Sequence, residues 1–316
     1  RPSSPSVAGA PSASTLPIFT RTRLLRPSRP FLRAPRPSSP LRHVRRRSMD
    51  EVGAMAGPIA ALAEFEASLV RSGLDITHRF DTAWYNDYVS EESLPLRPLP
   101  TCGRASAMAV LIGNTSALWP AFLAWLGTQP DPAGHADPLD AYVGGVIDLA
   151  VETLLASPGM EGTEHHIYWP WEGGERLVSM QRVAVASGLC YHDSGTQLAI
   201  HPTFGAWHAY RAVLVLGTPV LADALAPSAP SRLPCLLSGA EKAAARAAMS
   251  AALRASDEAN LCTQLHGAKG MERDVRLAWA ALRDCVQLGA EHRYSEAQLV
   301  YHYTKDKAVL LQAMQS

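Results

Sequence analysis

The chain has 316 residues, of which 47 % are apolar, so it can bury the core of one large domain or of two small ones. Its formal net charge of zero conceals a split, because residues 1–49 hold 11 of the 29 basic residues and none of the 29 acidic ones. Residues 50–316 therefore carry a net charge of −11, which argues against a nucleic acid as partner, since phosphate contacts need a basic surface.

Residues 1–49 form a basic arm rich in Pro, Ser and Arg, with too few large apolar residues to fold, and we expect it to be disordered. This acid-free composition is typical of an organellar transit peptide, but upstream sequence that is normally untranslated, with Met49 as the true start, explains it equally well. Residues 50–316 are expected to form a single folded domain in the cytoplasm, or in an organelle if the arm is a genuine transit peptide.

The residues that commonly bind metals are scattered along the chain. Cysteines without a CxxC pair suit a reducing compartment and predict neither a disulfide nor a zinc site. His165 and His166 are adjacent, and neighbours on a strand point to opposite faces, which favours an exposed pair over a shared metal ion. We therefore predict no metal site on the protein itself. The five cysteines are Cys102, Cys190, Cys235, Cys262 and Cys285.

The first half of the body predicts helices around one buried strand. An amphipathic helix that ends near Gly73 opens the folded part. Residues 107–127 predict a strand followed by a helix; polar residues, Gly and Pro near the middle make this charge-free stretch a poor membrane span, and we expect no membrane association. The next helix has Asp137 as its N-cap and Pro138 at its first position.

The second half mixes strands and helices without regular βαβ alternation, which favours an α+β fold. A turn with Pro and Gly is expected between two successive strands, and Ser295 is expected to cap the last helical segment, which holds one or two helices. The predicted strands are 164–171, 195–205 and 206–217, the predicted helices are 239–259, 275–288 and 294–314, and residues 176–191 predict a helix with a strand as the alternative.

The sequence lacks several motifs of well-known chemistry. It contains no GxGxxG, GxxxxGK[ST], HExxH or GxSxG. Rossmann-type dinucleotide binding, P-loop chemistry, zinc-dependent proteolysis and the hydrolase nucleophile elbow therefore have no local support.

Several sequence blocks resemble one known family when they are taken in order. Residues 201–217, HPTFGAWHAYRAVLVLG, are similar to the signature H-P-x-F-G-G-W-x-A-x-R-G-V-V-L-L of the cyanocobalamin reductase and alkylcobalamin dealkylase family, the methylmalonic aciduria and homocystinuria type C proteins. The resemblance implies a nitroreductase-like α+β fold, in which an antiparallel sheet is flanked by helices and carries a helical cap. The other matching blocks are AWYN at 83–86, DPLDAYV at 137–143, VASGLCY at 185–191, RYSEAQLVY at 293–301 and KAVLL at 307–311.

The resemblance also implies an activity on cobalamin. Members of the family bind cobalamin with its nucleotide base off the cobalt. They remove the upper ligand by reductive decyanation, with FMN or FAD and with NADPH as electron source, or by dealkylation with glutathione. A downstream cobalamin-trafficking protein is the expected partner, and a monomer or a ligand-induced homodimer is the expected state. The alternatives are a flavin reductase or nitroreductase relative without cobalamin, and a non-catalytic cobalamin carrier.

The resemblance assigns site residues in two groups. Arg211, Arg283 and Lys307 match the cations that bind the carboxylates of glutathione, a task for which Arg suits best because its guanidinium binds carboxylates in a bidentate manner. Lys307 stands where the family has Arg. The residues expected to hold the corrin or the flavin, in a cleft lined by aromatic rings, are Trp84, Tyr85, Asn86, Tyr191, His201, Pro202, Phe204, Gly205, Trp207, Tyr210 and Arg293.

Several of these residues have a structural alternative. Arg211 could pair with a carboxylate at the edge of the core, and Trp84 with Tyr85 could simply fill the core. His201 is more typical of a residue that stabilises a turn, and no D-x-H-x-x-G motif offers a histidine ligand to cobalt. Ala184 stands where animal members carry a histidine, so any role of that histidine is filled otherwise here.

Overall fold

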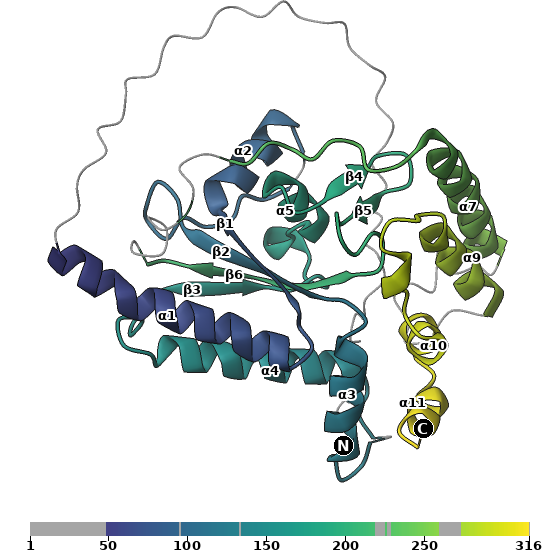
Figure 1. Cartoon of the computed structure of the whole chain (residues 1–316), viewed down its shortest axis with the longest axis horizontal. Helices are drawn as coiled ribbons and strands as arrows, with labels where there is room; N and C mark the ends of the chain where they lie inside the picture. Colours follow the sequence, from purple (N-terminus) through teal and green to yellow (C-terminus); the bar gives the residue numbers. More distant parts are fainter. Residues whose placement is uncertain are drawn as a thin grey trace, which may run out of the picture.

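The computed structural model describes residues 49–94, 96–132, 134–218, 225, 229–258 and 273–315 (Figure 1). Nearly all of the basic arm and Cys262 lie outside the described residues, so the expectation of a disordered arm stays a prediction. No helix within the described part is long and apolar enough to cross a membrane.

A four-stranded antiparallel sheet forms the centre of the fold, with the strand order β1-β2-β6-β3. The two central strands are buried along almost their whole length, which accounts for their continuous apolar sequence. The sheet confirms the predicted α+β class. Its strands are β1 (Ile76–Asp81), β2 (Met108–Asn114), β3 (His165–Tyr168) and β6 (Ala209–Leu216).

Helices cover both faces of the sheet because alternate residues of each strand point to opposite sides. Val110 and Leu214 pack on one face against α1 (Met49–Arg71), α3 (Leu118–Gly127) and α4 (Pro138–Leu155). On the other face, the neighbouring residues Leu111 and Val213 pack against α2 (Thr82–Glu91) and α5 (Met180–Ala186). Figure 1 shows α1 and α4 on one side of the sheet and α2 and α5 on the other.

The segment after α5 forms a small second sheet from β4 (Tyr191–Asp193) and β5 (Leu198–Ile200). Both strands predicted at 195–205 and 206–217 are present, but they belong to different sheets. Residues 201–208 connect them, and His201 and Gly205 form an isolated bridge there, with both backbone hydrogen bonds at 2.9 Å. The predicted connection is therefore a link between two sheets and not a simple hairpin.

The C-terminal part is helical, as predicted. α7 (Gly239–Glu258) and α9 (Arg273–Asp284) pack together around a small apolar core of their own, and we call this pair the helical cap. Short 3₁₀ turns occur at η1 (Gly174–Arg176) and η2 (Ala290–His292). Ser295 is the N-cap of α10 (Glu296–Thr304), as predicted, and α11 (Lys307–Ala313) follows. Figure 1 places the helical cap at one end of the sheet.

Candidate functional site

A β-bulge places Arg211 at the end of β6. The pairing between β2 and β6 passes from Ile112 opposite Ala212 to Gly113 opposite Tyr210, so Arg211 is the extra residue. Gly113 permits this close approach, since a Cβ atom there would lie 2.5 Å from the carbonyl oxygen of Ala209. Bulges are frequent next to active sites because they redirect a side chain. Here the bulge turns the side chain of Arg211 toward a hollow at the edge of the sheet.

The hollow has a volume of about 250 Å³ and is partly open to solvent. Six segments border it: the segment after α2 at Leu96, the start of α5 and the loop before it, β5, the start of β6 with the residues just before it, α9, and the region from Tyr294 through α10. Its apolar lining residues include Leu177, Val178, Met180, Leu198 and Leu282. Its polar or aromatic lining residues include His208, Tyr210, Arg211, Arg283, Tyr294, His302 and Tyr303.

Arg211 is only 2 % exposed, and its one hydrogen bond goes to a neutral group. Its Nε donates to the side-chain oxygen of Asn114 at 2.6 Å. Burial lowers the pKa of Arg211 from its usual value, although an arginine remains charged in a protein. Among the described residues no carboxylate lies within ion-pair distance of this guanidinium, but the charges of Asp140 and Asp137 are near enough to oppose the lowering of its pKa. Asp137 is itself paired with Lys305 at 3.1 Å. The alternative in which Arg211 interacts with a carboxylate at the edge of the core therefore holds only as a longer-range attraction.

Arg283, which is half-buried, brings a second guanidinium to the hollow from the last turn of α9. Its Nε donates to the carbonyl oxygen of Ala206 at 2.8 Å, and its Nη2 donates to that of His208 at 3.2 Å. The guanidinium carbon also lies 4.5 Å from the ring centre of Trp207 and 4.9 Å from that of Tyr294. Hydrogen bonds and ring contacts thus hold Arg283 without neutralising it, because its partners are carbonyls and aromatic rings.

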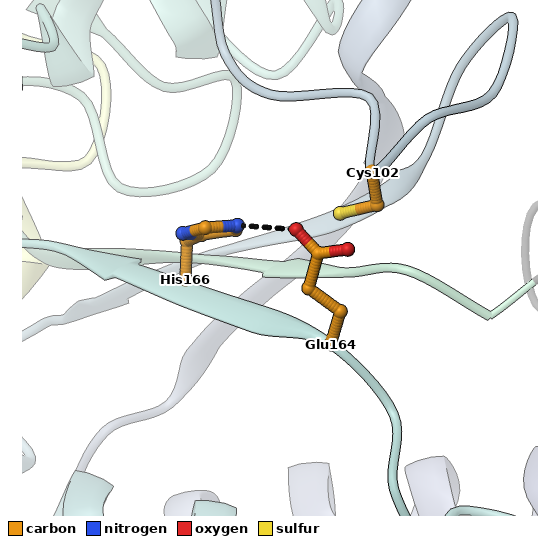
Figure 2. A group of neighbouring side chains, drawn as sticks. All are labelled: Cys102, Glu164 and His166. Carbon is orange, nitrogen blue, oxygen red and sulfur yellow. Dashed lines mark hydrogen bonds and ion pairs between the residues drawn. The ribbon is translucent and has the colours of Figure 1, made fainter.

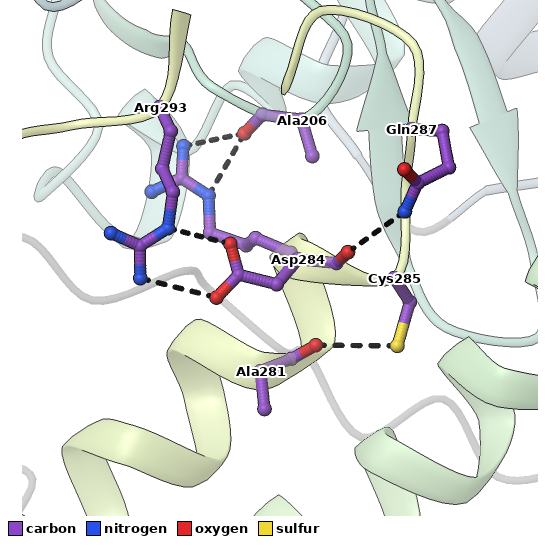
Figure 3. Close-up of polar contacts among 7 residues, drawn as sticks. Ala206, Ala281, Asp284, Cys285, Gln287 and Arg293 are labelled. Atoms are coloured by element: carbon purple, nitrogen blue, oxygen red, sulfur yellow. Dashed lines mark hydrogen bonds and ion pairs between the residues drawn. The ribbon is translucent and has the colours of Figure 1, made fainter. Parts of the chain in front are cut away.

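The neighbouring Arg293 is neutralised instead. It pairs with Asp284, with Nε 2.7 Å from one carboxylate oxygen (Figure 3). Its guanidinium carbon lies 5.3 Å from the ring centre of Trp207. Arg293 does not line the hollow as the structure describes it. The two arginines that contact the Trp207 ring therefore differ, since within the described residues Arg293 is paired with a carboxylate and Arg283 is not.

A neutral histidine, His208, lines the hollow from the segment that connects the two sheets. Burial, with smaller contributions from the nearby His201 and the charge of Arg283, lowers the pKa of His208 to about 3. Its Nε2 lies 3.0 Å from the hydroxyl of Tyr210, which is also 2.9 Å from the sulfur of Cys190. The His208 Nδ1 and the Tyr294 hydroxyl are buried without a hydrogen-bond partner in the described structure. Unsatisfied polar atoms of this kind, beside a hollow, are available to a ligand.

We expect His208 to make the protein less stable in acid. The folded state keeps this imidazole neutral, whereas the unfolded state takes up a proton below about pH 6.5, so stability falls as the pH drops from about 6.5 toward 3. Between pH 6.5 and 5 the contribution of one such group is about 2 kcal/mol. In urea unfolding, the free energy of unfolding of His208→Phe should fall between pH 6.5 and 5 by about that amount less than it does in the unmodified protein. His165→Phe, which changes an exposed histidine, should behave as the unmodified protein. Equal pH dependence in all three proteins would contradict this assignment.

The structure brings three of the predicted site residues together. Tyr210, Arg211 and Arg283 line the hollow, although Arg283 lies 72 residues after Arg211 in the chain. Trp207 is 1 % exposed and lies under the guanidinium of Arg283, so it positions that group and does not border the hollow directly. Lys307, at the start of α11, is half-buried and lies outside the lining.

The other predicted binding residues lie outside the lining. Trp84 and Tyr85 pack in the core between α2 and α5, and Asn86 forms hydrogen bonds of 2.7 and 3.0 Å with the backbone of Leu99. Tyr191 packs beside β5 with its hydroxyl 3.4 Å from Asp193. These contacts are structural, and a binding role for these four residues remains a prediction.

The predicted residues of 201–205 build the turn between the sheets. The His201 Nδ1 accepts hydrogen bonds from the backbone N–H groups of Thr203 and Phe204, at 3.0 and 3.2 Å, and its ring stacks on Phe204. Pro202 is exposed within the turn. Gly205 has a φ of +53°, and a Cβ atom there would lie 1.7 Å from the carbonyl oxygen of Leu288. The alternative of a turn-stabilising histidine thus agrees with the geometry.

Most of the rings in the hollow were not predicted from the sequence. Tyr294 belongs to the RYSEAQLVY block, and His302 and Tyr303 follow this block directly, so its continuation to residue 303 was the available signal. His208 falls on an unspecified position of the resembled signature, so the resemblance gave no signal for it.

The sheet, its two helical layers and the half-polar hollow define an α+β fold of the nitroreductase-like kind. No family model and no curated protein matches the sequence. Among solved structures, the fold is similar to the crystal structure of the Caenorhabditis elegans B12-trafficking protein CblC, a homologue of human MMACHC. The TM-score is 0.55 and the identity 18 %, over 83 % of this chain and 96 % of that one. The expected resemblance is thus confirmed at the level of the fold.

Proposed function

We propose that this protein binds cobalamin in the hollow, with the nucleotide base off the cobalt, and removes the upper axial ligand. The observation that supports this most is the pair of guanidinium groups of Arg211, which is buried, and Arg283, which is half-buried: both line the hollow together with apolar residues and make no close ion pair within the described structure. The pair occurs on the fold of a B12-trafficking protein. A cationic and apolar hollow suits a substrate complex that combines a large macrocycle with an anionic co-substrate.

The volume of the hollow bears on how the proposed ligands are placed. At about 250 Å³ it is smaller than the about 300–1,000 Å³ of ordinary ligand sites, so a whole corrin does not fit inside it. We therefore place the macrocycle across the solvent-open side of the hollow, in contact with its apolar lining residues. The small upper ligand and the group that removes it would occupy the hollow itself.

Glutathione is the proposed co-substrate for alkyl ligands. It carries two carboxylates, and a guanidinium binds a carboxylate through two parallel hydrogen bonds. A buried cation without a carboxylate at close range is unfavourable, so an anion that pairs with Arg211 offsets part of a desolvation cost that the free protein already bears. The half-buried Arg283 offers the same anion a second guanidinium. The bound thiolate attacks the alkyl carbon, the carbon–cobalt bond breaks, and its electron pair stays on the cobalt, which leaves a thioether and reduced cobalamin.

Cyanide is proposed to leave by the reductive route. A reduced flavin, FMN or FAD with NADPH as the electron source, would supply the electrons. The apolar lining residues of the hollow suit contact with a planar ring, and the nitroreductase-like fold supports a flavin as reductant. The residues of the chain then act by holding the macrocycle and by excluding water from the cobalt.

A spectral titration tests the proposal. The purified protein is mixed with methylcobalamin without oxygen, the visible spectrum is recorded, and glutathione is then added. We expect a base-off shift on binding, followed by loss of the methylcobalamin spectrum and formation of S-methylglutathione. A base-off shift that glutathione leaves unchanged would identify a carrier, and the absence of any shift would favour a flavin reductase or nitroreductase relative. Either result would overturn the proposed activity.

A further inference from the structure

Three side chains with different donor atoms meet at the edge of the sheet, far along β6 from the hollow. Figure 2 shows Cys102, Glu164 and His166 pointing toward one another. One ligand atom from each lies within 4.8 Å of the others, and the Nε2 of His166 is 3.0 Å from a Glu164 carboxylate oxygen. Strand β3 pairs there with the Leu216 end of β6, whereas Arg211 lies at the opposite end.

The local chain explains why these groups converge. Glu164 and His166 are two residues apart at the start of β3, and residues with this spacing on an extended chain share one face. His165, between them, points to the other face and is exposed. The pair that can share an ion is therefore Glu164 with His166, in a Glu-x-His spacing, and not the two adjacent histidines.

Gly217 brings Cys102 to this pair. Its N–H donates to the Glu164 carbonyl oxygen at 2.8 Å, which fixes the start of β3. A Cβ atom at Gly217 would lie 2.8 Å from the Cβ and 3.1 Å from the sulfur of Cys102, so only glycine leaves room for the thiol. Cys102 itself has a φ of +51°, a left-handed conformation that is rare for a non-glycine residue and is often found where a side chain has a function.

We propose that Cys102, Glu164 and His166 bind a divalent metal ion of the Zn²⁺ class. Thiolate sulfur, imidazole nitrogen and carboxylate oxygen are the ligand types that Zn²⁺ takes, at about 2.3 Å for sulfur and about 2.0–2.2 Å for nitrogen and oxygen. Mg²⁺ and Ca²⁺ prefer oxygen alone, so the donor set discriminates against them. Three protein ligands leave the fourth position to solvent, which the partial exposure of Glu164 and His166 permits.

The bound ion would join two segments that the sheet does not connect. Cys102 belongs to the loop between α2 and β2, whereas His166 belongs to β3 and Glu164 directly precedes it. The far edge of β3 has no neighbouring strand in the described sheet. The site uses none of the residues proposed to bind cobalamin or glutathione. Its success or failure is therefore separate from that of the proposed function.

Titration of the cobalamin-free protein with Co²⁺ ions, as a spectroscopic substitute for Zn²⁺, tests the site. We expect one ion per chain, with a sulfur-to-cobalt charge-transfer absorption in the near ultraviolet that Zn²⁺ abolishes by displacement. Cys102→Ser should remove this absorption, and His166→Gln should weaken binding by at least about 100-fold, more than the loss of an outer-shell partner costs.

Two matched variants complete the design. His165→Gln changes the exposed neighbour on the other face, and Cys235→Ser removes the exposed thiol near the cap; both should bind Co²⁺ as the unmodified protein does. Zn²⁺ should also raise the melting temperature of the unmodified protein and leave that of Cys102→Ser unchanged. Absence of the charge-transfer absorption in the unmodified protein, its persistence in Cys102→Ser, or an equal loss in His165→Gln and His166→Gln would each overturn the proposal.

Discussion

Replacing Arg211 by Ala should lower kcat/KM for glutathione in the demethylation of methylcobalamin by about 10- to 150-fold, the effect of losing a charged hydrogen bond worth about 1.5–3 kcal/mol. The base-off binding of cobalamin should largely persist, because the apolar lining residues that we assign to the macrocycle are unchanged. Initial rates against glutathione concentration, together with the binding spectrum, measure the two properties separately.

Two variants distinguish loss of the site from loss of the fold. Arg211→Lys keeps the charge but loses the bidentate geometry, so its rate should lie between those of the other two proteins. Arg254→Ala removes an exposed arginine of α7 and should leave the rate unchanged. Unaltered dependence on glutathione in Arg211→Ala would refute the role assigned to this residue. A lost base-off shift, with the melting temperature unchanged, would show that Arg211 also binds the macrocycle.

Gly205→Ala should destabilise the protein by about 2–5 kcal/mol. A side chain in the left-handed conformation costs about 1–2 kcal/mol, and displacing packed neighbours costs about 1–3 kcal/mol. Both costs apply here, because Gly205 has a φ of +53° and the new Cβ atom would meet the backbone carbonyl of Leu288 at 1.7 Å. Urea unfolding followed by circular dichroism gives the change in the free energy of unfolding.

The matched control is Gly145→Ala, in the middle of α4. Gly145 is exposed, and a Cβ atom there would have no neighbour within 4 Å, so Ala should stabilise the helix by about 0.5–1 kcal/mol. The same substitution is thus expected to act in opposite directions at the two positions. A change below about 1 kcal/mol in Gly205→Ala would contradict the close approach of the turn to Leu288.

Features that depend on neighbouring residues could be predicted from the sequence. Asp137 and Ser295 cap their helices as expected, because a cap needs only a short polar side chain and backbone N–H groups two or three residues away. The buried strand β2 could likewise be predicted from its continuous apolar sequence. These rules act within a few residues and hold without knowledge of the tertiary fold.

Features that depend on distant pairing could not be predicted in the same way. The sequence predicts β5 and β6 as consecutive strands. The strands with which each of them pairs depend on residues outside this segment, and for β6 these lie far along the chain. The bulge at Arg211 is likewise visible only once β2 lies beside β6. The resemblance identified Arg211 and Arg283, yet the partners of His208 and Tyr294, and the meeting of Cys102 with the start of β3, depend on the tertiary structure.

The two guanidinium groups of the hollow belong to different parts of the molecule, with Arg211 on the central sheet and Arg283 on the helical cap. An anion that contacts both would act as a tether between sheet and cap. Anion binding and docking of the helical cap are then coupled, and the coupling free energy is the same in both directions. A change that loosens the docked cap must therefore weaken the binding of the anion. Residues of the interface between α9 and the 201–208 turn could therefore control co-substrate affinity without touching the co-substrate.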